Sequence, residues 1–347
     1  MVCLNLKQSD NLERQIKNKV KERNKTKNST SKTPRASGVF FCYNKFMDLK
    51  RVGILRGGQK DNYENSLKKG GELISFIFEN LSNKYKPVDI LVDLEGIWHI
   101  GGLPVKPADL MHRVDVVWNA SHPSFSKILE DLSIPHVGQD NFSSAVGKSR
   151  DMLQKHMKDI GVKMPRHILL PPYQEDFDGP RNEYSIKKAK EVFEKFSSPW
   201  IVRSFNADPD VGVHLAKTFP ELIEAIEDIS KHRDTILVEE FISGKNAFMH
   251  SVPGFRGEDI YVFPAGKFSK DEKERLHNLA KNIHEQIGAR YYLKSNFVLN
   301  PKKGIYLTSV EFFPEIKKNS HFNRACDSVG AKMDHVLEHI LDRAFGA

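Results

Sequence analysis

The sequence predicts an α/β protein built from more than one lobe. Its 347 residues are enough for two or three lobes and a sizeable core. Between residues 50 and 138, short apolar runs alternate with amphipathic stretches, as in a parallel sheet covered by helices. Further along the chain, an amphipathic stretch at 217–231 has the length needed to cover one face of a second sheet.

The first lobe is expected to end near Gly138. Its expected elements are strands at 50–55, 88–94, 114–119 and 134–137, helices at 66–81 and 125–132, and a hairpin edge at 98–103.

The second half is expected to begin with one long helix at 143–160, which contains Lys148. The elements expected after it are an extended segment at 165–170, helices at 186–196, 217–231, 269–287 and 334–344, strands at 200–203 and 235–241, and a strand pair at 297–299 and 305–311 joined by a turn at 300–304. We find no internal repeats.

The net charge of +8 belongs to the first 46 residues, which carry eleven Lys and Arg against Asp10, Glu13 and Glu22. The remaining residues carry 42 basic and 42 acidic side chains. The tail at 1–46 is rich in Lys, Asn, Ser and Thr, and we expect it to be disordered. It is either a basic arm able to touch phosphate or anionic lipid, or an extension upstream of a true start at Met47. A neutral body gives no reason to expect a specific nucleic-acid partner.

The three cysteines predict a reducing, cytoplasmic setting. Cys3 and Cys42 lie in the tail and Cys326 stands alone, so neither a disulfide framework nor a zinc spacing is present, and Cys326 is expected to be structural. No stretch approaches the roughly 18 apolar residues of a membrane helix, and the basic start has no apolar signal core after it. We therefore expect no membrane association.

Four segments fall in the order and spacing of a nucleotide-binding ligase: 199–213 (PWIVRSFNADPDVGV), 236–244 (ILVEEFISG), 292–300 (YLKSNFVLN) and 305–315 (IYLTSVEFFPE). Together with the first lobe they resemble the D-alanine–D-alanine ligase family of the ATP-grasp superfamily, over about 47–345. The resemblance implies a three-lobed ATP-grasp fold with an N-terminal parallel-sheet pre-ATP-grasp domain. The implied domains are a substrate lobe at 47–139, a central lobe at 140–196 and 197–245, and a C-terminal lobe at 246–347.

In the first lobe, the segment 55–67 looks like the family's glycine turn, which holds the first D-alanine. The resemblance places Glu64 and Ser66 in register there as catalytic residues, although a glycine pair after a strand often serves only the backbone turn. The segment 114–122 is similar to the strand that leads to a histidine near the substrate. This assigns His122 to substrate binding, with an ordinary loop histidine as the alternative.

For ATP, the resemblance assigns two cations to the phosphates. Lys148 matches the family's lysine that binds the nucleotide phosphates from the central lobe. The alternative is an ordinary solvated lysine on a helix. Arg203 stands where a second lysine is usual, and it keeps the charge with a forked geometry. The adenine segment, which acts through its backbone, and the ribose ligand are implied at Glu239, Glu240, Phe241, Ile242 and Asn246.

The loop expected to close over the phosphates, 204–213, departs from the family. A glycine-rich backbone would let N–H groups approach phosphate closely. Here only Gly212 remains, and Asp208 and Asp210 bring negative charge.

The metal ligands depart further. The family's two-magnesium set of Asp, Glu and Asn maps onto Asn296, Glu311 and Phe313. Magnesium prefers carboxylate oxygens, so one atypical or reduced site is expected. Glu315 would share a face with Glu311 if the strand continues, because side chains alternate in a strand. Lys317 and Lys318 either neutralise phosphate without metal or form a solvated loop.

Around the second substrate, Lys294 occupies the register of the arginine that stabilises the transition state, and it keeps the charge without the fork. Ser320 and His321 are in register for substrate binding, whereas Phe322 replaces a serine. A tyrosine-bearing lid normally lies between Pro264 and Lys267 and is missing here.

The resemblance implies an enzyme that uses ATP and Mg²⁺ to join two D-alanines through an acylphosphate for peptidoglycan precursor synthesis. Two alternatives stay open. One is an ATP-grasp ligase with a different acid and amine, and the other is an impaired paralogue that binds nucleotide or a partner. A homodimer is compatible with all three interpretations.

Overall fold

The computed structural model describes residues 49–346 except 59–61, 206–211 and 265. The chain divides into two units, Met1–Met47 and Asp48–Ala347. The tail predicted at 1–46, with Cys3 and Cys42, lies outside the described residues and stays a prediction. The same holds for Asp208 and Asp210 in the loop expected over the phosphates.

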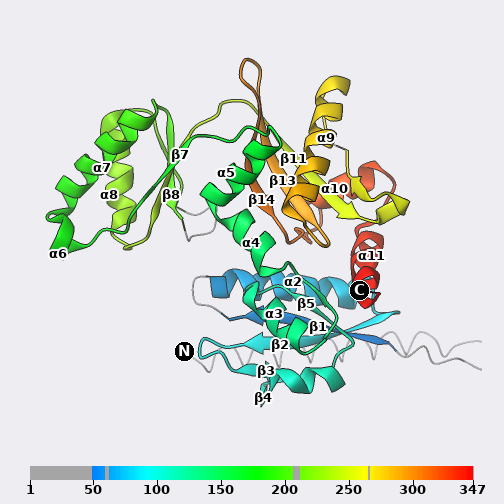
Figure 1. Ribbon diagram of the computed structural model, residues 1–347. Helices are drawn as coiled ribbons and strands as arrows, with labels where there is room; N and C mark the ends of the chain where they lie inside the picture. Colours follow the sequence, from blue (N-terminus) through cyan, green and yellow to red (C-terminus); the bar gives the residue numbers. More distant parts are fainter. Residues whose placement is uncertain (1–48, 59–61, 206–211, 265, 347) are drawn as a thin grey trace, which may run out of the picture. The chain divides into compact units, whose positions relative to one another are not determined.

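Within the described residues, the strands form one sheet of six and two sheets of four. The first sheet has the order β4-β3-β2-β1-β5-β6 and defines the N-terminal lobe (Figure 1). Its strands are β1 (Lys50–Gly57), β2 (Tyr85–Val92), β3 (Trp98–Ile100), β4 (Leu103–Val105), β5 (Val116–Asn119) and β6 (His136–Val137). β1, β2, β5 and β6 pair in parallel, and β3 and β4 form the antiparallel edge. This mixed sheet confirms the predicted α/β class.

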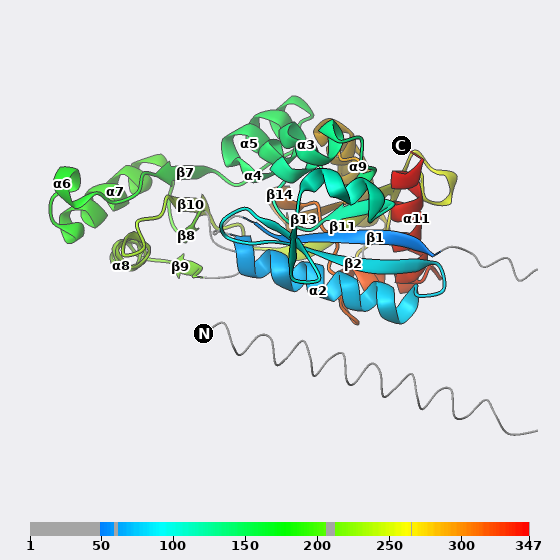
Figure 2. The same ribbon diagram turned by 90° about the horizontal axis from the view of Figure 1, so that it is seen from below.

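Helix α2 (Tyr63–Asn80) lies across β1 and β2 (Figure 2). Its buried residues Leu73 and Ile77 join a core with Val52 and Ile54 of β1. α3 (Ser124–Asp131) and the short helix η2 (Pro107–His112) bring Leu129 and Leu110 to the other core of the lobe. The parallel strands therefore lie between two apolar layers, as expected for a sheet with continuous apolar runs.

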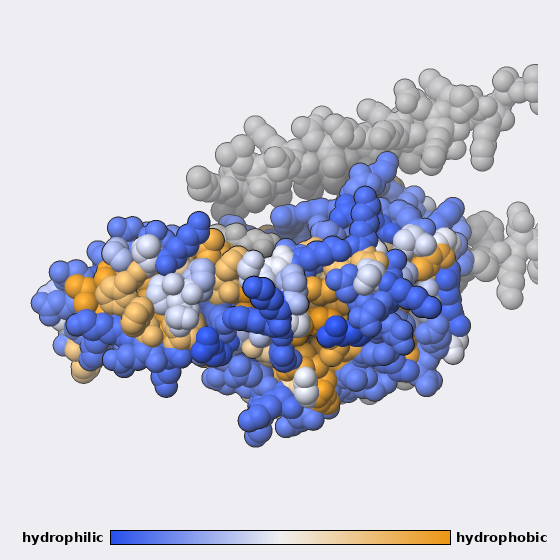
Figure 3. Space-filling view, turned by 90° about the horizontal axis from the view of Figure 1, so that it is seen from above, coloured by the Kyte–Doolittle hydropathy of each residue, from blue (hydrophilic) through white to orange (hydrophobic). Residues whose placement is uncertain are grey.

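The central lobe is an antiparallel sheet of order β7-β10-β8-β9 with two helices packed against it (Figure 1). Its strands are β7 (His167–Leu170), β8 (Trp200–Ser204), β9 (His214–Ala216) and β10 (Ile236–Glu240), and its helices are α6 (Glu175–Asp178), α7 (Arg181–Lys195) and α8 (Phe219–Ser230). Ala189 and Val192 of α7 and Ile226 of α8 form one core with Trp200 and Val238 of the sheet. Figure 3 shows apolar surface over this lobe, where Phe177 and Phe193 are exposed.

The C-terminal lobe is an antiparallel sheet of order β12-β11-β13-β14. Its elements are β11 (Lys245–Pro253), η3 (Phe255–Gly257), β12 (Ile260–Val262), α9 (Lys270–Ile287), β13 (Leu293–Asn300), β14 (Gly304–Glu311), α10 (His321–Ser328) and α11 (Met333–Phe345). Leu276, Ala280 and Ile283 of α9 pack on Phe297 and Leu307 of the sheet. The predicted turn at 300–304 is present, with the Asn300 side chain accepting bonds from two of its amides.

The single long helix predicted at 143–160 is wrong. The chain forms α4 (Asn141–Lys148) and α5 (Arg150–Asp159), separated by Ser149 in an extended conformation. The Ser149 hydroxyl accepts a bond from the amide of Met152 and caps α5, which offers the backbone an alternative to a continuous helix. As a result, Lys148 and Arg150 lie in different surroundings.

Other boundaries also differ from the prediction. β2 begins three residues earlier than expected and ends at Val92. β6 has two residues, whereas four were predicted. β9, β11, β12 and α10 were not predicted at all. In the part of the chain that is described, no helix is long and apolar enough to cross a membrane.

Candidate active site

Two arginines share one carboxylate between the central lobe and α5. Arg150, the first residue of α5, donates from Nη2 to Oε1 of Glu239 on β10. The Nε of Arg203, at the end of β8, lies 3.7 Å from Oε2 of the same carboxylate. The three side chains are 8, 16 and 10 % exposed for Arg150, Arg203 and Glu239, respectively. Two buried guanidinium groups therefore meet at one carboxylate of the described residues.

Arg150 also has an unused donor. Its Nε is buried, and within the described residues it has no hydrogen-bond partner. Buried polar groups are almost always paired, so such a donor is unusual and suits a bound anion. The sequence prediction missed Arg150 because Lys148, two residues earlier, was taken as the phosphate cation on an unbroken helix.

The segment assigned to adenine links two lobes. Glu240 accepts bonds from Arg166 (2.9 Å) and from Lys303 in the turn between β13 and β14 (3.2 Å). Burial alone would raise the pKa of Glu240, but these two bonds outweigh it and the pKa is lowered. Phe241 donates its amide to the carbonyl of Pro199.

The other predicted nucleotide residues lie around this segment. Ile242 is buried, whereas Asn246, at the start of β11, is exposed. Gly212 is exposed with a positive φ of 65°. None of the three makes a contact that tests its predicted role.

A cavity of about 220 Å³ lies between the N-terminal lobe, α4 and the ends of β13 and β14. Its lining includes Lys69 of α2, Lys148 of α4, Trp118 of β5 and Glu311 of β14. Its other lining residues are Asn62, Asn119, Ala120, Ser121, Pro123, Val137, Gly138, Gln139, Ser144, Gly147, Tyr291, Tyr292, Val310, Phe312 and Phe313. The cavity thus gathers aromatic walls and two lysines.

Two lysines, Lys69 and Lys148, line this cavity. Burial lowers the pKa of Lys148, and the charge of Lys69 lowers it further. Burial also lowers the pKa of His122, with a smaller contribution from Lys148. His122 Nδ1 lies 2.8 Å from the Ser124 hydroxyl. Of these two predicted site residues, Lys148 lines the cavity and His122 does not.

The glycine turn begins at Gly57, at the end of β1. Gly57 has a φ of 87°, and a Cβ there would lie 2.1 Å from the carbonyl oxygen of Val92, so only glycine fits. Ser66 is buried and accepts the amide of Gly57 at 2.9 Å, so its hydroxyl holds the turn. Glu64 is exposed and does not line the cavity, whereas Asn62 does.

Lys294, Asn296 and Glu311 form a hydrogen-bonded cluster across β13 and β14. Lys294 Nζ lies 3.0 Å from Glu311 Oε1, and Asn296 Nδ2 donates to the same oxygen at 2.9 Å. Asn296 Nδ2 also lies 2.7 Å from the Ser309 hydroxyl, and its Oδ1 is buried without a described partner. The amide nitrogen must face Glu311 because an ionised carboxylate can only accept. Lys294 Nζ also lies 5.4 Å from the centre of the Phe248 ring.

These residues do not fit a magnesium site. The carboxylate of Glu311 is already held by an ammonium and an amide N–H. Phe313 packs against Trp118, with ring centroids 6.2 Å apart. β14 ends at Glu311, so the condition under which Glu315 would share its strand face, a strand continuing past Pro314, is not met. Among the described residues, no group of three His, Cys, Asp or Glu can hold a metal ion.

The predicted second-substrate residues lie at the start of α10. Ser320 caps this helix by accepting the amide of Asn323, and it donates to the carbonyl of Glu315. His321 lies against Phe248, with centroids 4.1 Å apart, and burial followed by the charge of Arg324 lowers its pKa. Phe322 is fully buried. The Ser320 hydroxyl thus supports the helix.

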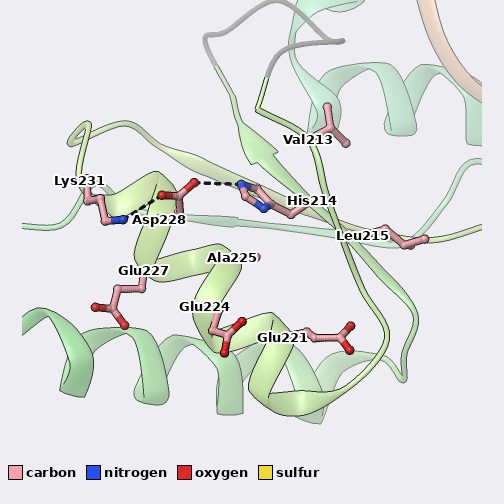
Figure 4. A pocket seen from close by; sticks show the side chains of 9 residues that line it. All are labelled: Val213, His214, Leu215, Glu221, Glu224, Ala225, Glu227, Asp228 and Lys231. Carbon is pink, nitrogen blue, oxygen red and sulfur yellow. Dashed lines mark hydrogen bonds and ion pairs between the residues drawn. The ribbon is translucent and has the colours of Figure 1, made fainter.

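A second hollow, of about 640 Å³, lies on the central lobe along β9 and α8 (Figure 4). Asp228 there holds His214 (3.2 Å) and Lys231 (2.9 Å). Three further carboxylates of α8, those of Glu221, Glu224 and Glu227, line it. None of the predicted site residues lies in it, so the smaller cavity with the two lysines is the better candidate.

Comparisons with known proteins show what this chain resembles. A family model described as D-ala D-ala ligase C-terminus matches residues 157–254. A D-alanine–D-alanine ligase of Aquifex aeolicus is 22 % identical, over 84 % of this chain and 99 % of the relative.

Two solved structures show the same fold. The D-alanine–D-alanine ligase of Coxiella burnetii matches with a TM-score of 0.69 at 17 % identity, over 86 % of this chain and 95 % of that one. The Bacillus anthracis ligase complexed with ATP matches with a TM-score of 0.63 at 19 % identity, over 85 % of this chain and 96 % of that one. The chain therefore has the ATP-grasp fold of these solved ligases, and its sequence resembles the D-alanine–D-alanine ligases over most of its length.

Proposed function

We propose that the chain is an ATP-dependent carboxylate–amine ligase. A carboxylate oxygen of the acid attacks the γ-phosphorus of ATP, which releases ADP and forms an acylphosphate. The amine nitrogen then attacks the acyl carbon, phosphate leaves, and the nitrogen loses a proton to give the amide. The names of the relatives make two D-alanines and a peptidoglycan precursor the first substrates and product to test. Because ATP is consumed, we place the reaction in the cytoplasm.

The observation that supports this proposal is that two buried arginines, Arg150 and Arg203, meet at the carboxylate of Glu239. Guanidinium groups bind phosphate oxygens in a forked geometry, and the free Nε of Arg150 provides one further donor. We assign the ATP phosphates to these arginines, with the adenine along Glu239–Ile242. In this assignment Arg150 takes the role that the sequence gave to Lys148.

Lys294 is assigned to the oxygen that becomes negative when the amine attacks. Its ammonium is held by Glu311 at the edge of the cavity, so the charge is positioned before the reaction, as electrostatic stabilisation requires. No step is assigned to magnesium, since the residues in the family's metal positions do not fit it.

Nucleotide binding provides the first test. Arg150→Met and Arg203→Met should each weaken ATP binding about tenfold to a hundredfold, the usual effect of losing one charge-assisted bond. Arg275→Met is the matched control, because this arginine is exposed on α9 and pairs only with Asp271 among the described residues. Equal ATP affinity in all three variants would remove the arginine assignment.

A second candidate follows from the cluster around Glu311. A carboxylate engaged by Lys294 and Asn296, with Phe313 packed on Trp118, suits a paralogue that binds nucleotide without ligating. The two candidates differ in one result. The ligase forms ADP when an acid is present, whereas the paralogue binds ATP and forms no ADP with any acid.

A further inference from the structure

We propose that the cavity between Lys69 and Lys148 takes a carboxylic acid with a second anionic group, and not a zwitterionic amino acid such as D-alanine. This inference rests on the proposed function, because it names the class of acid that the same site would activate. The second group is a carboxylate or a phosphonate-like dianion, and both offer the oxygens that lysines recognise.

The two lysines are the first argument. Both line the cavity, and neither has an ion pair or hydrogen bond with another described residue. Burial lowers the pKa of Lys148, and the charge of Lys69 lowers it further. Like charges gathered without counter-ions are unfavourable unless a ligand supplies the counter-charge.

The carboxylates around the cavity are the second argument. Among the described lining residues, Glu311 alone carries a carboxylate, and Lys294 and Asn296 already engage it. The ammonium of a zwitterionic amino acid would therefore meet two lysines and no free carboxylate of the described lining. An acid with a second anionic group would instead find a cation for each of its charges.

The walls set the size and shape of the acid. Trp118 and Phe313 meet edge to face, and Phe312 lies so close to α4 that a Cβ on Gly147 would be 2.5 Å from its ring. A cavity of 220 Å³ corresponds to about seven water molecules. This size suits a short acid, with its reacting carboxylate toward Lys294 and its second group toward Lys69 and Lys148.

The break at Ser149 gives Lys148 and Arg150 different surroundings. Arg150 faces Glu239 across the central lobe, whereas Lys148, at the end of α4, lines the cavity with Lys69. Lys148 therefore belongs to the acid in this proposal, and the nucleotide phosphates belong to Arg150 and Arg203.

Calorimetric binding to the full chain tests the proposal with four probes: succinate, 3-phosphonopropionate, propionate and D-alanine. One or both dianions should bind at least tenfold more tightly than propionate and D-alanine. Lys69→Gln and Lys148→Gln should each weaken the dianion about tenfold to a hundredfold. Lys68→Gln is the matched control, since it changes an exposed neighbour that does not line the cavity. A preference between the two dianions identifies the second group.

Three results would overturn the proposal. The first is D-alanine binding as tightly as both dianions. The second is unchanged dianion affinity in both Lys69→Gln and Lys148→Gln. The third is a loss of ATP affinity in Lys148→Gln as large as its loss of dianion affinity. Arg203→Met separates this inference from the proposed function, because it should weaken ATP and leave dianion binding unchanged. Lysine-dependent dianion binding without ADP formation would reject the ligase alone. ADP formation with D-alanine and no dianion binding would reject the inference alone.

Discussion

Replacing Glu239 with Gln removes the carboxylate that Arg150 and Arg203 share. The guanidinium side chains are 8 and 16 % exposed, so water can replace little of the lost charge. Removing one partner from a buried ion pair costs about 3–5 kcal/mol, because the other charge stays buried and uncompensated. We expect the free energy of unfolding of Glu239→Gln to fall by about this amount.

The neighbouring carboxylate provides the control. Glu240 pairs with Arg166 and Lys303, whose side chains are each 56 % exposed. Partners that stay hydrated contribute about 0–1 kcal/mol, so Glu240→Gln should be much less destabilising than Glu239→Gln.

Urea unfolding followed by tryptophan fluorescence measures both variants, since Trp200 lies opposite Glu240 in the central sheet. Pyrophosphate should stabilise Glu239→Gln more than the wild type, because the arginines no longer have a competing carboxylate. Equal destabilisation by the two substitutions, or a weaker effect of pyrophosphate on Glu239→Gln, would refute the idea that Glu239 restrains a buried anion site.

Three other predictions follow from the described contacts. Asn296→Asp with Phe313→Asn should raise magnesium affinity, measured by calorimetry, because it adds oxygen ligands beside Glu311; unchanged affinity would contradict this. Deleting residues 1–46 should leave the melting temperature unchanged, since the body forms its own unit, and loss of folded protein would show otherwise. Burial, with a smaller effect of Lys294, lowers the pKa of His250 from 6.5 to about 3. Between these two pH values the unfolded chain therefore binds more protons than the folded chain. Stability should therefore fall as the pH drops through this window, and His250→Gln should reduce the slope; an unchanged slope would exclude His250 as the cause.

Much of the fold could be predicted from apolar periodicity. The parallel strands of the N-terminal lobe and the helices α8, α9 and α11 lie close to their predicted positions. β11 was missed because its sequence, KNAFMHSVP, lacks regular alternation and its second half is buried on both faces. The break at Ser149 was missed because the residues on both sides favour helix and the cap shows only in the three-dimensional contacts.

The site was less predictable, since its geometry depends on where the elements end. Placing Glu311 and Glu315 on one strand face required β14 to continue, and it ends at Glu311. The pairing of Arg150 with Glu239 joins residues 89 apart in sequence, which no local pattern records. By contrast, Lys294 and Glu311 follow from the register of two adjacent strands, and the structure brings them together.

Formation of ADP from ATP by the full chain, measured with and without a carboxylic acid, tests the ligase proposal most directly. D-alanine, succinate and 3-phosphonopropionate are the acids, and hydroxylamine traps the acylphosphate as a hydroxamate. We predict ADP only when an acid is present, one hydroxamate for each ADP, and loss of both products in Arg203→Met. Tight ATP binding with no ADP from any of the three acids would contradict the ligase and favour a nucleotide-binding paralogue.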